Sequence, residues 1–171
     1  SGVVLFMPAF VPSSSTAPAA TGAKIVSVFG GNRELGIPTI NAVVVMIDPT
    51  TGQALGILEG ATITALRTGA VSGAATDLLA RPDSRVLAII GAGAQGVTQA
   101  AAICSVRNIN EIRIFDVSET ARYSFAERLA SWLPGSVARV RPVASSQEAV
   151  TGADIICTAT TATRAVFEDD W

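Results

Sequence analysis

Histidine is absent from the 171 residues of this sequence, and lysine occurs once, at Lys24. Without histidine, these residues hold no Ser-His-Asp or Cys-His triad, no histidine-ligated zinc and no histidine general base. We therefore predict that no metal site is present. Any acid–base chemistry must come from Lys24, from a carboxylate, or from residues beyond the two ends of the sequence.

Charge runs, long apolar runs and paired cysteines are also missing. The net charge is −2 and the arginines form no cluster, so nucleic-acid binding has no electrostatic support. No apolar run approaches the ~20 residues that span a bilayer, and the first residues lack the charged start and cleavage site of a signal peptide. Cys104 and Cys157 stand apart in apolar surroundings and are expected to be buried. These absences indicate a cytoplasmic protein that has no nucleic-acid or membrane partner.

Apolar residues make up 49% of the chain, which is rich in core-forming material. Over the first sixty residues the apolar positions alternate as they do in strands. We expect an extended segment at 3–6, an irregular loop to residue 22, strands at 23–29, 40–47 and 53–58, and turns at 30–32 and 48–52. This region predicts a small, largely antiparallel β layer.

Over residues 60–80 the apolar residues recur at the spacing of a helix, and Pro82 is expected to end this helix. Small residues at 69, 70 and 73–75 permit close packing. We place a domain boundary here, with residues 1–80 in one domain and 81–171 in the other. Strands are then expected at 86–90, 111–116, 138–143 and 154–158, and helices at 96–106, 119–133 and 147–151. This order predicts an α/β fold with a parallel sheet and helices on both faces.

A glycine-rich turn follows the strand at 86–90 and opens the next helix, with the sequence Gly91-Ala92-Gly93-Ala94-Gln95-Gly96. In such a turn the first glycine allows the sharp bend, the second leaves room for a diphosphate, and the third lets the helix approach the sheet. The helix N-terminus offers N–H groups and a partial positive charge to the diphosphate. The alternative is a glycine-rich turn that binds no ligand.

Asp116 ends the next strand, twenty residues after Gly96, where its carboxylate would accept hydrogen bonds from the adenosine ribose. A carboxylate repels a 2′-phosphate, which favours NAD over NADP, and Arg122 one helical turn further on does not reverse this preference. The alternative role for Asp116 is a strand-end helix cap. After the fourth strand, Thr158 and Thr160 would face the nicotinamide half of the cofactor or belong to an ordinary polar loop.

The predicted sheet stops after about four strands, whereas a Rossmann dinucleotide fold normally has six. We therefore expect a chain that is truncated, proteolysed or one part of a split structure. The absent initiator methionine is consistent with an internal piece of a longer chain.

The helix from Ile63 to Ser72, coupled to the Gly91–Gly96 turn, resembles the ornithine cyclodeaminase/mu-crystallin family. The stretch from Gly22 to Phe29, then Asn32, then the turn at 48–52, fits the same family in order and spacing, and the resemblance covers nearly the whole chain. It implies a homodimer of chains about twice this length. Each chain would join an N-terminal α/β substrate and dimerisation domain to a Rossmann NAD(P)-binding domain, and would act at a carbon that bears an amino or imino group.

The resemblance also implies roles for particular residues. Lys24 corresponds to the family's active-site lysine, Arg67 to the arginine that reaches the substrate carboxylate, Thr68 to a cofactor phosphate contact, and Gln95 to part of the diphosphate turn. The family's catalytic aspartate would lie beyond Trp171, and the arginine of the cyclodeaminases would precede the first residue. The stretch 27–32 departs from that of true ornithine cyclodeaminases, which argues against ornithine as the substrate.

The residue types agree with these roles. A lysine that is desolvated in an apolar strand could serve as a general acid or base near pH 7, although Lys24 could also be a surface lysine on a polar face. Arg67 interrupts a helix of small residues and needs an anion, either a substrate carboxylate or an internal salt bridge to Glu59 or Asp77. Glu59 precedes the helix and favours its N-terminus, so we assign it no catalytic role.

We therefore expect an NAD-dependent enzyme that transfers hydride at the amino or imino carbon of an amino acid or cyclic ketimine. The alternative is a non-catalytic, crystallin-like protein that binds NAD(P) and a small molecule. A short-chain or 2-hydroxyacid dehydrogenase is disfavoured by the missing histidine, the missing Tyr-x-x-x-Lys pair and the β layer that precedes the glycine turn. If the missing strands and aspartate are absent from the sample, we expect it to be inactive.

Overall fold

The computed structural model describes residues 2–133, 135 and 138–171. The chain forms two compact units, residues 1–64 and residues 65–171, and the division falls inside helix α1 (Gly60–Leu79). The domain boundary that the sequence predicts after residue 80 lies at the other end of this helix and stays a prediction. None of the helices in the described residues is long and apolar enough to cross a membrane.

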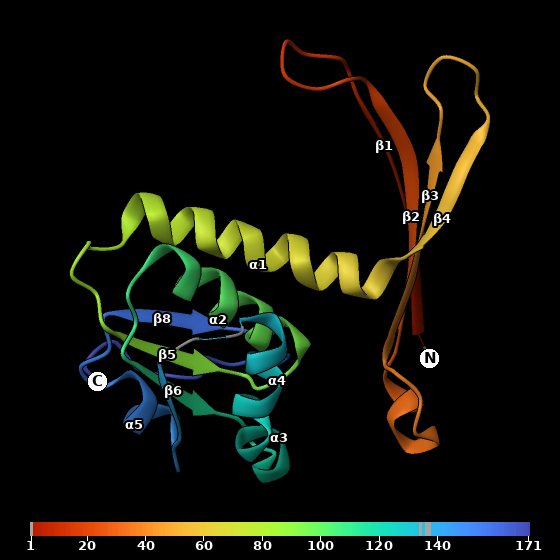
Figure 1. Ribbon diagram of the computed structural model, residues 1–171. Coiled ribbons are helices and arrows are strands. Elements are labelled where there is room, and N and C mark those ends of the chain that lie inside the picture. The colour runs from red at the N-terminus through yellow and green to blue at the C-terminus, as the bar shows by residue number, and fades with distance from the viewer. Residues whose placement is uncertain (1, 134, 136–137) are drawn as a thin grey trace. The chain divides into compact units, whose positions relative to one another are not determined.

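The first unit is built on a four-stranded antiparallel sheet, as the alternating pattern predicts (Figure 1). Its strands are β1 (Gly2–Val11), β2 (Ala20–Phe29), β3 (Ile40–Ile47) and β4 (Ala54–Glu59), paired in that order. The 30–32 turn is the start of a short 3-10 helix, η1 (Gly30–Leu35). The Val3–Phe6 segment proves to be a strand of ten residues that pairs with β2 along its whole length. Pro8 is compatible with this pairing because β1 lies at the sheet edge, where a missing N–H is tolerated.

Strand periodicity gives this sheet two distinct faces. Met7, Lys24 and Val44 are opposite one another in the register and share the face that we call the lysine face. The intervening residues, among them Phe6, Phe10, Val45 and Ile57, share the opposite face, which we call the apolar face. In this unit the described hydrophobic side chains are mostly exposed or half-buried, with Val26 the buried exception.

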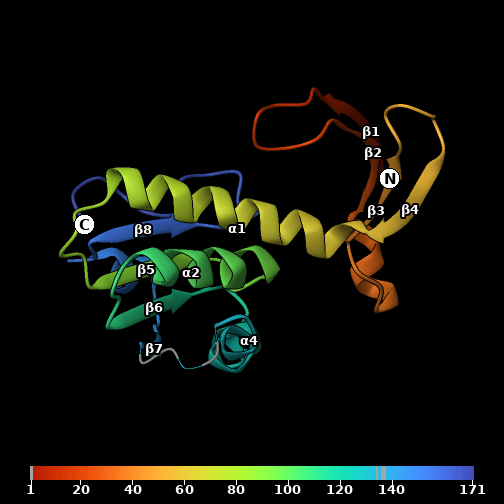
Figure 2. The same cartoon turned by 45° about the horizontal axis from the view of Figure 1, so that its top comes forward.

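The second unit contains the parallel sheet that the alternating strands and helices predict (Figures 1 and 2). Its strands are β5 (Val86–Ile90), β6 (Glu111–Phe115), β7 (Arg139–Pro142) and β8 (Ile155–Thr158), in the spatial order β7-β6-β5-β8. This is the order 3-2-1-4 of a Rossmann fold. The chain reverses its direction of travel across the sheet between β5 and β8, and ligands of such folds bind at the carboxyl ends of the strands at that point.

Helices cover both faces of the parallel sheet, as predicted. Helix α2 (Ala94–Val106) and helix α4 (Phe125–Trp132) pack on one face, where Leu87, Ile89, Ile112 and Ile114 are fully buried against them. Helix α5 (Ser146–Val150) and the segment at Val166–Phe167 pack on the other face. Strand β5 is apolar on both sides because it is central and covered twice.

The helix predicted over residues 119–133 is wrong as a single element. The chain forms α3 (Glu119–Tyr123), a break at Ser124, and then α4. The Ser124 hydroxyl donates to the Ala121 carbonyl, a side-chain bond to the backbone that favours a bend. The break lets the Phe125 ring become fully buried in the core. Ser118 caps α3 as predicted, since its hydroxyl accepts a hydrogen bond from the Ala121 N–H.

Candidate functional site

The glycine turn leaves the carboxyl end of β5 through a conformation that only glycine adopts easily. Gly91 has a φ of 110°, and its N–H donates to the Phe115 carbonyl at the end of β6. A Cβ atom at this position would lie 2.2 Å from the Ala159 carbonyl oxygen. Gly91 is therefore required by its backbone angle and by the close approach of the loop that follows β8.

Gly93 and Gly96 meet different surroundings. A Cβ on Gly96 would lie 2.1 Å from the Gly91 carbonyl oxygen, so this glycine lets α2 approach the strand closely. A Cβ on Gly93 would meet nothing within 4 Å. Gly93 is also the N-cap residue of α2 and supplies no side-chain cap, so the first N–H groups of the helix keep their donors for another acceptor. The turn thus presents a partial positive charge to open space.

Asp116 is placed beside this turn by the end of β6. One carboxylate oxygen accepts a hydrogen bond of 2.7 Å from the Ala92 N–H, and the other accepts one of 2.8 Å from the Ser118 N–H. The cap of α3 is Ser118, so the alternative reading of Asp116 as the helix cap is not needed. Each carboxylate oxygen has a second lone pair, so the oriented group can still accept hydrogen bonds from a sugar.

The loop after β8 borders the same turn. The Ala159 N–H donates to the Ile90 carbonyl at 2.7 Å, which holds this loop against the end of β5. Thr158 and Thr160 are both exposed, and the Thr160 hydroxyl accepts a hydrogen bond from the Ala162 N–H. Their position at the carboxyl edge of the sheet agrees with the sequence prediction, and their contact with a nicotinamide stays a prediction.

Helix α1 lies against the first turns of α2. The Thr98 hydroxyl donates to the Ala65 carbonyl at 2.9 Å, and a Cβ on Gly69 would lie 2.6 Å from the Thr98 carbonyl oxygen. Gly73 packs against Ala102 in the same way, so small residues do permit the close packing that the sequence predicts. Arg67 and Thr68 are thereby placed on the part of α1 beside the start of α2.

Arg67 is exposed, and within the described part of the chain it has no ion-pair partner. Glu59 and Asp77, the two internal salt-bridge partners that the sequence offers Arg67, are engaged elsewhere. Asp77 pairs with Arg107 at 2.9 Å, and Glu59 accepts 2.7 Å hydrogen bonds from the Ala61 and Thr62 N–H groups at the start of α1. The Arg67 guanidinium is therefore available to an external anion.

Lys24 belongs to the first unit, on the central strand β2. Its Nζ atom lies 3.5 Å from the Thr64 hydroxyl oxygen, and its side chain is half-buried. A cavity of about 240 Å³ lies beside it on the lysine face. The other side chains that line this cavity are apolar or small, among them Met7, Ala9, Val11, Val44 and Met46. Lys24 is thus the one cationic group in the lining of an otherwise apolar cavity.

Sequence reasoning missed two contacts near the turn. Arg128 of α4 donates to the Ala92 carbonyl oxygen at 2.5 Å, and Thr98 joins α2 to α1. Neither contact has a local signal, because an arginine in an amphipathic helix looks like a solvent-facing residue and a threonine in an apolar helix looks like core packing. The buried Oε1 atom of Gln95 has no partner in the described residues.

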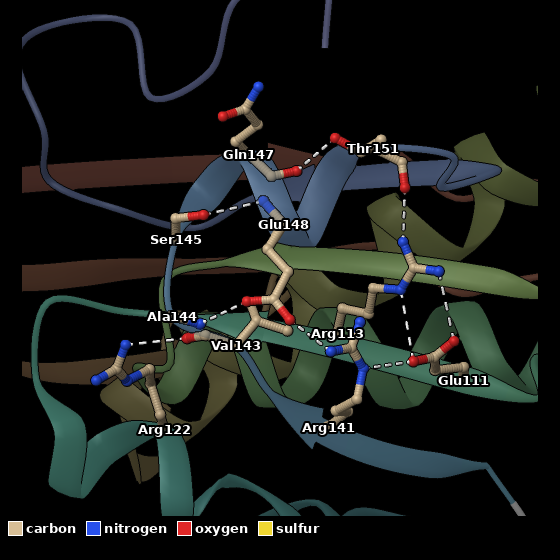
Figure 3. Close-up of polar contacts among 10 residues, drawn as sticks. All are labelled: Glu111, Arg113, Arg122, Arg141, Val143, Ala144, Ser145, Gln147, Glu148 and Thr151. Carbon is tan, nitrogen blue, oxygen red and sulfur yellow. Dashed lines mark hydrogen bonds and ion pairs between the residues drawn. The ribbon is translucent and has the colours of Figure 1, made fainter.

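The remaining polar clusters are structural. Figure 3 shows Glu111 between Arg113 and Arg141, with Glu148 on the other side of Arg141. Hydrogen bonding to Arg141 lowers the pKa of Glu111, and the Ala144 N–H followed by Arg141 lowers the pKa of Glu148. Every charge in this cluster is matched, so the cluster ties β6, β7 and α5 together and leaves no charge for a ligand.

The cysteines and acidic groups offer no further chemistry. The sequence predicts Cys104 and Cys157 to be buried, but both are only half-buried. This partial burial still raises the pKa of each thiol to about 11, so both are protonated at neutral pH. Across residues 2–133, 135 and 138–171, no three histidine, cysteine or acidic residues gather where they could hold a metal ion.

Comparisons with known proteins point in one direction. The model of the ornithine cyclodeaminase/mu-crystallin family matches residues 1–171. A Δ1-pyrroline-2-carboxylate reductase of Bacillus cereus is 39% identical over 159 residues, which are 93% of this chain and 48% of that protein.

Solved structures of proteins with related activities also superimpose on this chain. The Δ1-pyrroline-2-carboxylate reductase of Thermococcus litoralis, in complex with NADH and L-proline, superimposes with a TM-score of 0.81 at 35% identity, covering 97% of this chain and 54% of that one. An archaeal alanine dehydrogenase dimer with bound NAD superimposes with a TM-score of 0.76 at 27% identity, covering 98% and 53%. The chain therefore spans about half the length of the relatives that it matches, and it belongs to the ornithine cyclodeaminase/mu-crystallin family.

Proposed function

We propose that this chain carries the NAD(H)-binding part of an NAD-dependent enzyme that transfers hydride at the imino or amino carbon of a small cyclic imine or amino acid. The observation that carries the proposal is the glycine turn at the Rossmann switch point, with open space above Gly93 and an oriented carboxylate at Asp116. Relatives with this fold bind NADH or NAD.

The residues fit the cofactor in two ways. The start of α2 at Ala94, Gln95 and Gly96 would receive the diphosphate, since Gly93 at its N-cap offers these N–H groups no side-chain acceptor. Asp116 would accept the ribose hydroxyls and disfavour a 2′-phosphate, which supports NAD over NADP. Arg122 does not offset this preference, because it is engaged with the Val143 carbonyl and lies 5.7 Å from the Phe115 ring centroid.

The chemistry divides between the cofactor and the chain. When bound, the nicotinamide supplies or accepts the hydride. In the reductive direction Lys24 would donate a proton to the imine nitrogen, and Arg67 would hold the substrate carboxylate through its free guanidinium. Thr68, Thr158 and Thr160 would border the cofactor. The domains would follow the family pattern, with the substrate part in residues 1–80 and the cofactor part in residues 81–171.

We also propose that the working form is a homodimer, in which the apolar face of the first sheet is covered by a second copy. Phe6 and Ile57 on this face are each 72% exposed, and Phe10 is 63% exposed. Exposed apolar patches of this kind mark interaction sites. The free, protonated thiols favour a cytoplasmic location.

Calorimetric titration with NADH and NADPH tests the cofactor assignment. We expect NADH to bind about tenfold or more tightly than NADPH, a difference of ~1.4 kcal/mol or more. Asp116→Asn should weaken NADH binding, whereas Glu127→Gln, which changes an exposed carboxylate on α4, should not. The absence of heat from either nucleotide would contradict the proposal.

A turnover assay distinguishes the proposed enzyme from a non-catalytic, crystallin-like binding protein. NADH oxidation is followed with Δ1-pyrroline-2-carboxylate and other cyclic imines, in the intact protein that carries this chain. Consumption that Lys24→Met abolishes would support the enzyme. NADH binding without turnover over this panel would favour a binding protein.

A further inference from the structure

Arg128 makes an unusual contact with the glycine turn from a distant helix. Its Nη2 atom, carried on α4, donates to the Ala92 carbonyl oxygen at 2.5 Å and to the Ala121 carbonyl oxygen at 3.1 Å. Its Cζ atom lies 5.8 Å from the centroid of the Phe125 ring, which is itself fully buried. The guanidinium is therefore held by the core on one side and by the end of α3 on another.

Both polar groups of Ala92 are consequently fixed by charged side chains. Its N–H donates to the Asp116 carboxylate at 2.7 Å, and its carbonyl oxygen accepts from Arg128. Charge-assisted hydrogen bonds of this kind are about twice as strong as neutral ones. Ala92 is also buried, so no water competes freely for these groups.

Fixing the Ala92 carbonyl has a consequence one residue along. The carbonyl of Ala92 and the N–H of Gly93 belong to one planar trans peptide and point in opposite directions. An arginine that holds the carbonyl on the protein side therefore turns the Gly93 N–H away from α4. The space beside Gly93 is also open, since a Cβ on this residue would meet nothing within 4 Å.

We propose that Arg128 is a positioning residue for cofactor binding, which sets the Ala92–Gly93 peptide so that the turn presents its N–H groups to the diphosphate. This inference rests on the proposed function, because it concerns the same turn. Arg128 does not itself need to touch the cofactor. Changing Arg128 should therefore weaken the binding of ligands that carry a diphosphate. The affinity for ligands that contact only Asp116 should stay unchanged.

The test compares two ligands on the 171-residue chain. Binding of NADH is measured by calorimetry, and binding of adenosine, which has the ribose but no phosphate, by ligand-observed NMR. In Arg128→Met we expect NADH to bind about tenfold or more weakly, from the loss of a charged hydrogen bond, while the affinity for adenosine changes less than about twofold. Arg128→Lys keeps a charged donor and should recover part of the NADH affinity.

Arg141→Met is the matched control. Arg141 is also a partly buried, ion-paired arginine of the same unit, but it bonds Glu111 and Glu148 away from the turn. This variant should melt at a lower temperature with NADH affinity unchanged. If Arg128→Met does not fold, the comparison is made on Arg128→Lys, which should lose about threefold in NADH affinity and nothing for adenosine.

Three outcomes are informative. An NADH affinity in Arg128→Met equal to that of the unmodified chain would overturn the positioning role. Equal losses for NADH and adenosine would also overturn it, since they indicate general loosening of the fold. An unmodified chain that binds adenosine and NADH equally weakly would overturn the diphosphate site itself, and with it the proposed function.

Discussion

Gly91 and Gly93 stand two residues apart in one turn but are glycines for different reasons. Gly91 has a φ of 110° and no room for a Cβ beside Ala159, whereas Gly93 has an ordinary φ of −75° and open space around it. The first glycine is therefore a requirement of the fold. The second is a requirement only if a ligand approaches.

Alanine substitutions separate these two requirements. Gly91→Ala should reduce the free energy of unfolding by about 3 kcal/mol, since it combines backbone strain with overpacking. Gly93→Ala should cost less than about 1 kcal/mol, because its new methyl group meets no protein atom. Denaturant unfolding measures both changes.

NADH titration of Gly93→Ala completes this test. The variant should fold like the unmodified chain and bind NADH more weakly, because the methyl group occupies the space predicted for the diphosphate. Unchanged NADH affinity in Gly93→Ala would show that the cofactor does not pass over this residue.

At the scale of elements, a single arginine side chain makes several contacts with the C-terminal end of helix α1, within the second unit. The Arg107 side chain, only 10% exposed, donates to the carbonyl oxygens of Thr76, Asp77, Ala80 and Arg81 and pairs with the Asp77 carboxylate. The carbonyls at the end of a helix lack a full set of intrahelical donors, and Arg107 supplies a charged donor to four of them, so it acts as a C-terminal cap of α1.

Removing this cap should destabilise the fold. We expect Arg107→Ala to lower the free energy of unfolding by about 2 kcal/mol, because four carbonyls at the end of α1, two of them in part-buried hydrogen bonds, lose a charged donor. Arg139→Ala, which changes an exposed arginine on β7, is the control and should cost less than about 0.5 kcal/mol. Equal stability losses in the two variants by urea titration would refute the capping role.

The ion-pair cluster of β6, β7 and α5 gives the stability a predictable pH dependence. The pKa of Glu111 is lowered below its ordinary value of 4.5, mainly by Arg141. A lowered folded-state pKa means that the stabilisation is complete above about pH 4.5 and is lost as the pH falls through the folded-state pKa.

Glu111→Gln should therefore be less stable than the unmodified chain by about 1 kcal/mol at neutral pH, and the difference should shrink below about pH 4.5. Chemical unfolding of both proteins from neutral pH down to about pH 3 measures the difference. If the stability difference between the two proteins stays constant or widens in acid, the ion pair of Glu111 is not the source of the stabilisation.

At the scale of the whole molecule, the two units differ in how much of their apolar surface is covered. The parallel sheet has a core on both faces, whereas the antiparallel sheet leaves Phe6, Phe10 and Ile57 exposed on its apolar face. Exposed apolar residues of this kind favour a partner surface, and in the proposed homodimer a second copy would supply one by symmetry.

A charge placed on the apolar face should disrupt that association. Phe6→Glu is expected to shift sedimentation velocity profiles from dimer to monomer without altering the Rossmann unit, because a buried unpaired carboxylate is costly. Leu35→Glu, a change at an exposed apolar residue in η1, is the control. An unmodified chain that sediments as a monomer at all concentrations would contradict the dimer.

The sequence predicted the elements best where local rules were sufficient. Strand β3 was predicted at its observed bounds and the glycine turn in its observed place, because a run of β-branched residues and a G-x-G-x-x-G after an apolar strand are local signals. The break at Ser124 was missed, since it depends on burial of Phe125 in a core that the local sequence does not show.

The sequence by itself determined the fold class, the antiparallel and parallel sheets, and the candidate residues from Lys24 to Thr160, because periodicity and motif spacing are properties of the chain. The tertiary structure decided which groups meet. Arg128 reaches Ala92 across thirty-six residues, Asp116 reaches the same residue across twenty-four, and Thr98 reaches Ala65 across thirty-three. Local sequence patterns cannot predict such partners, because each contact forms only when separate helices and strands pack on one core.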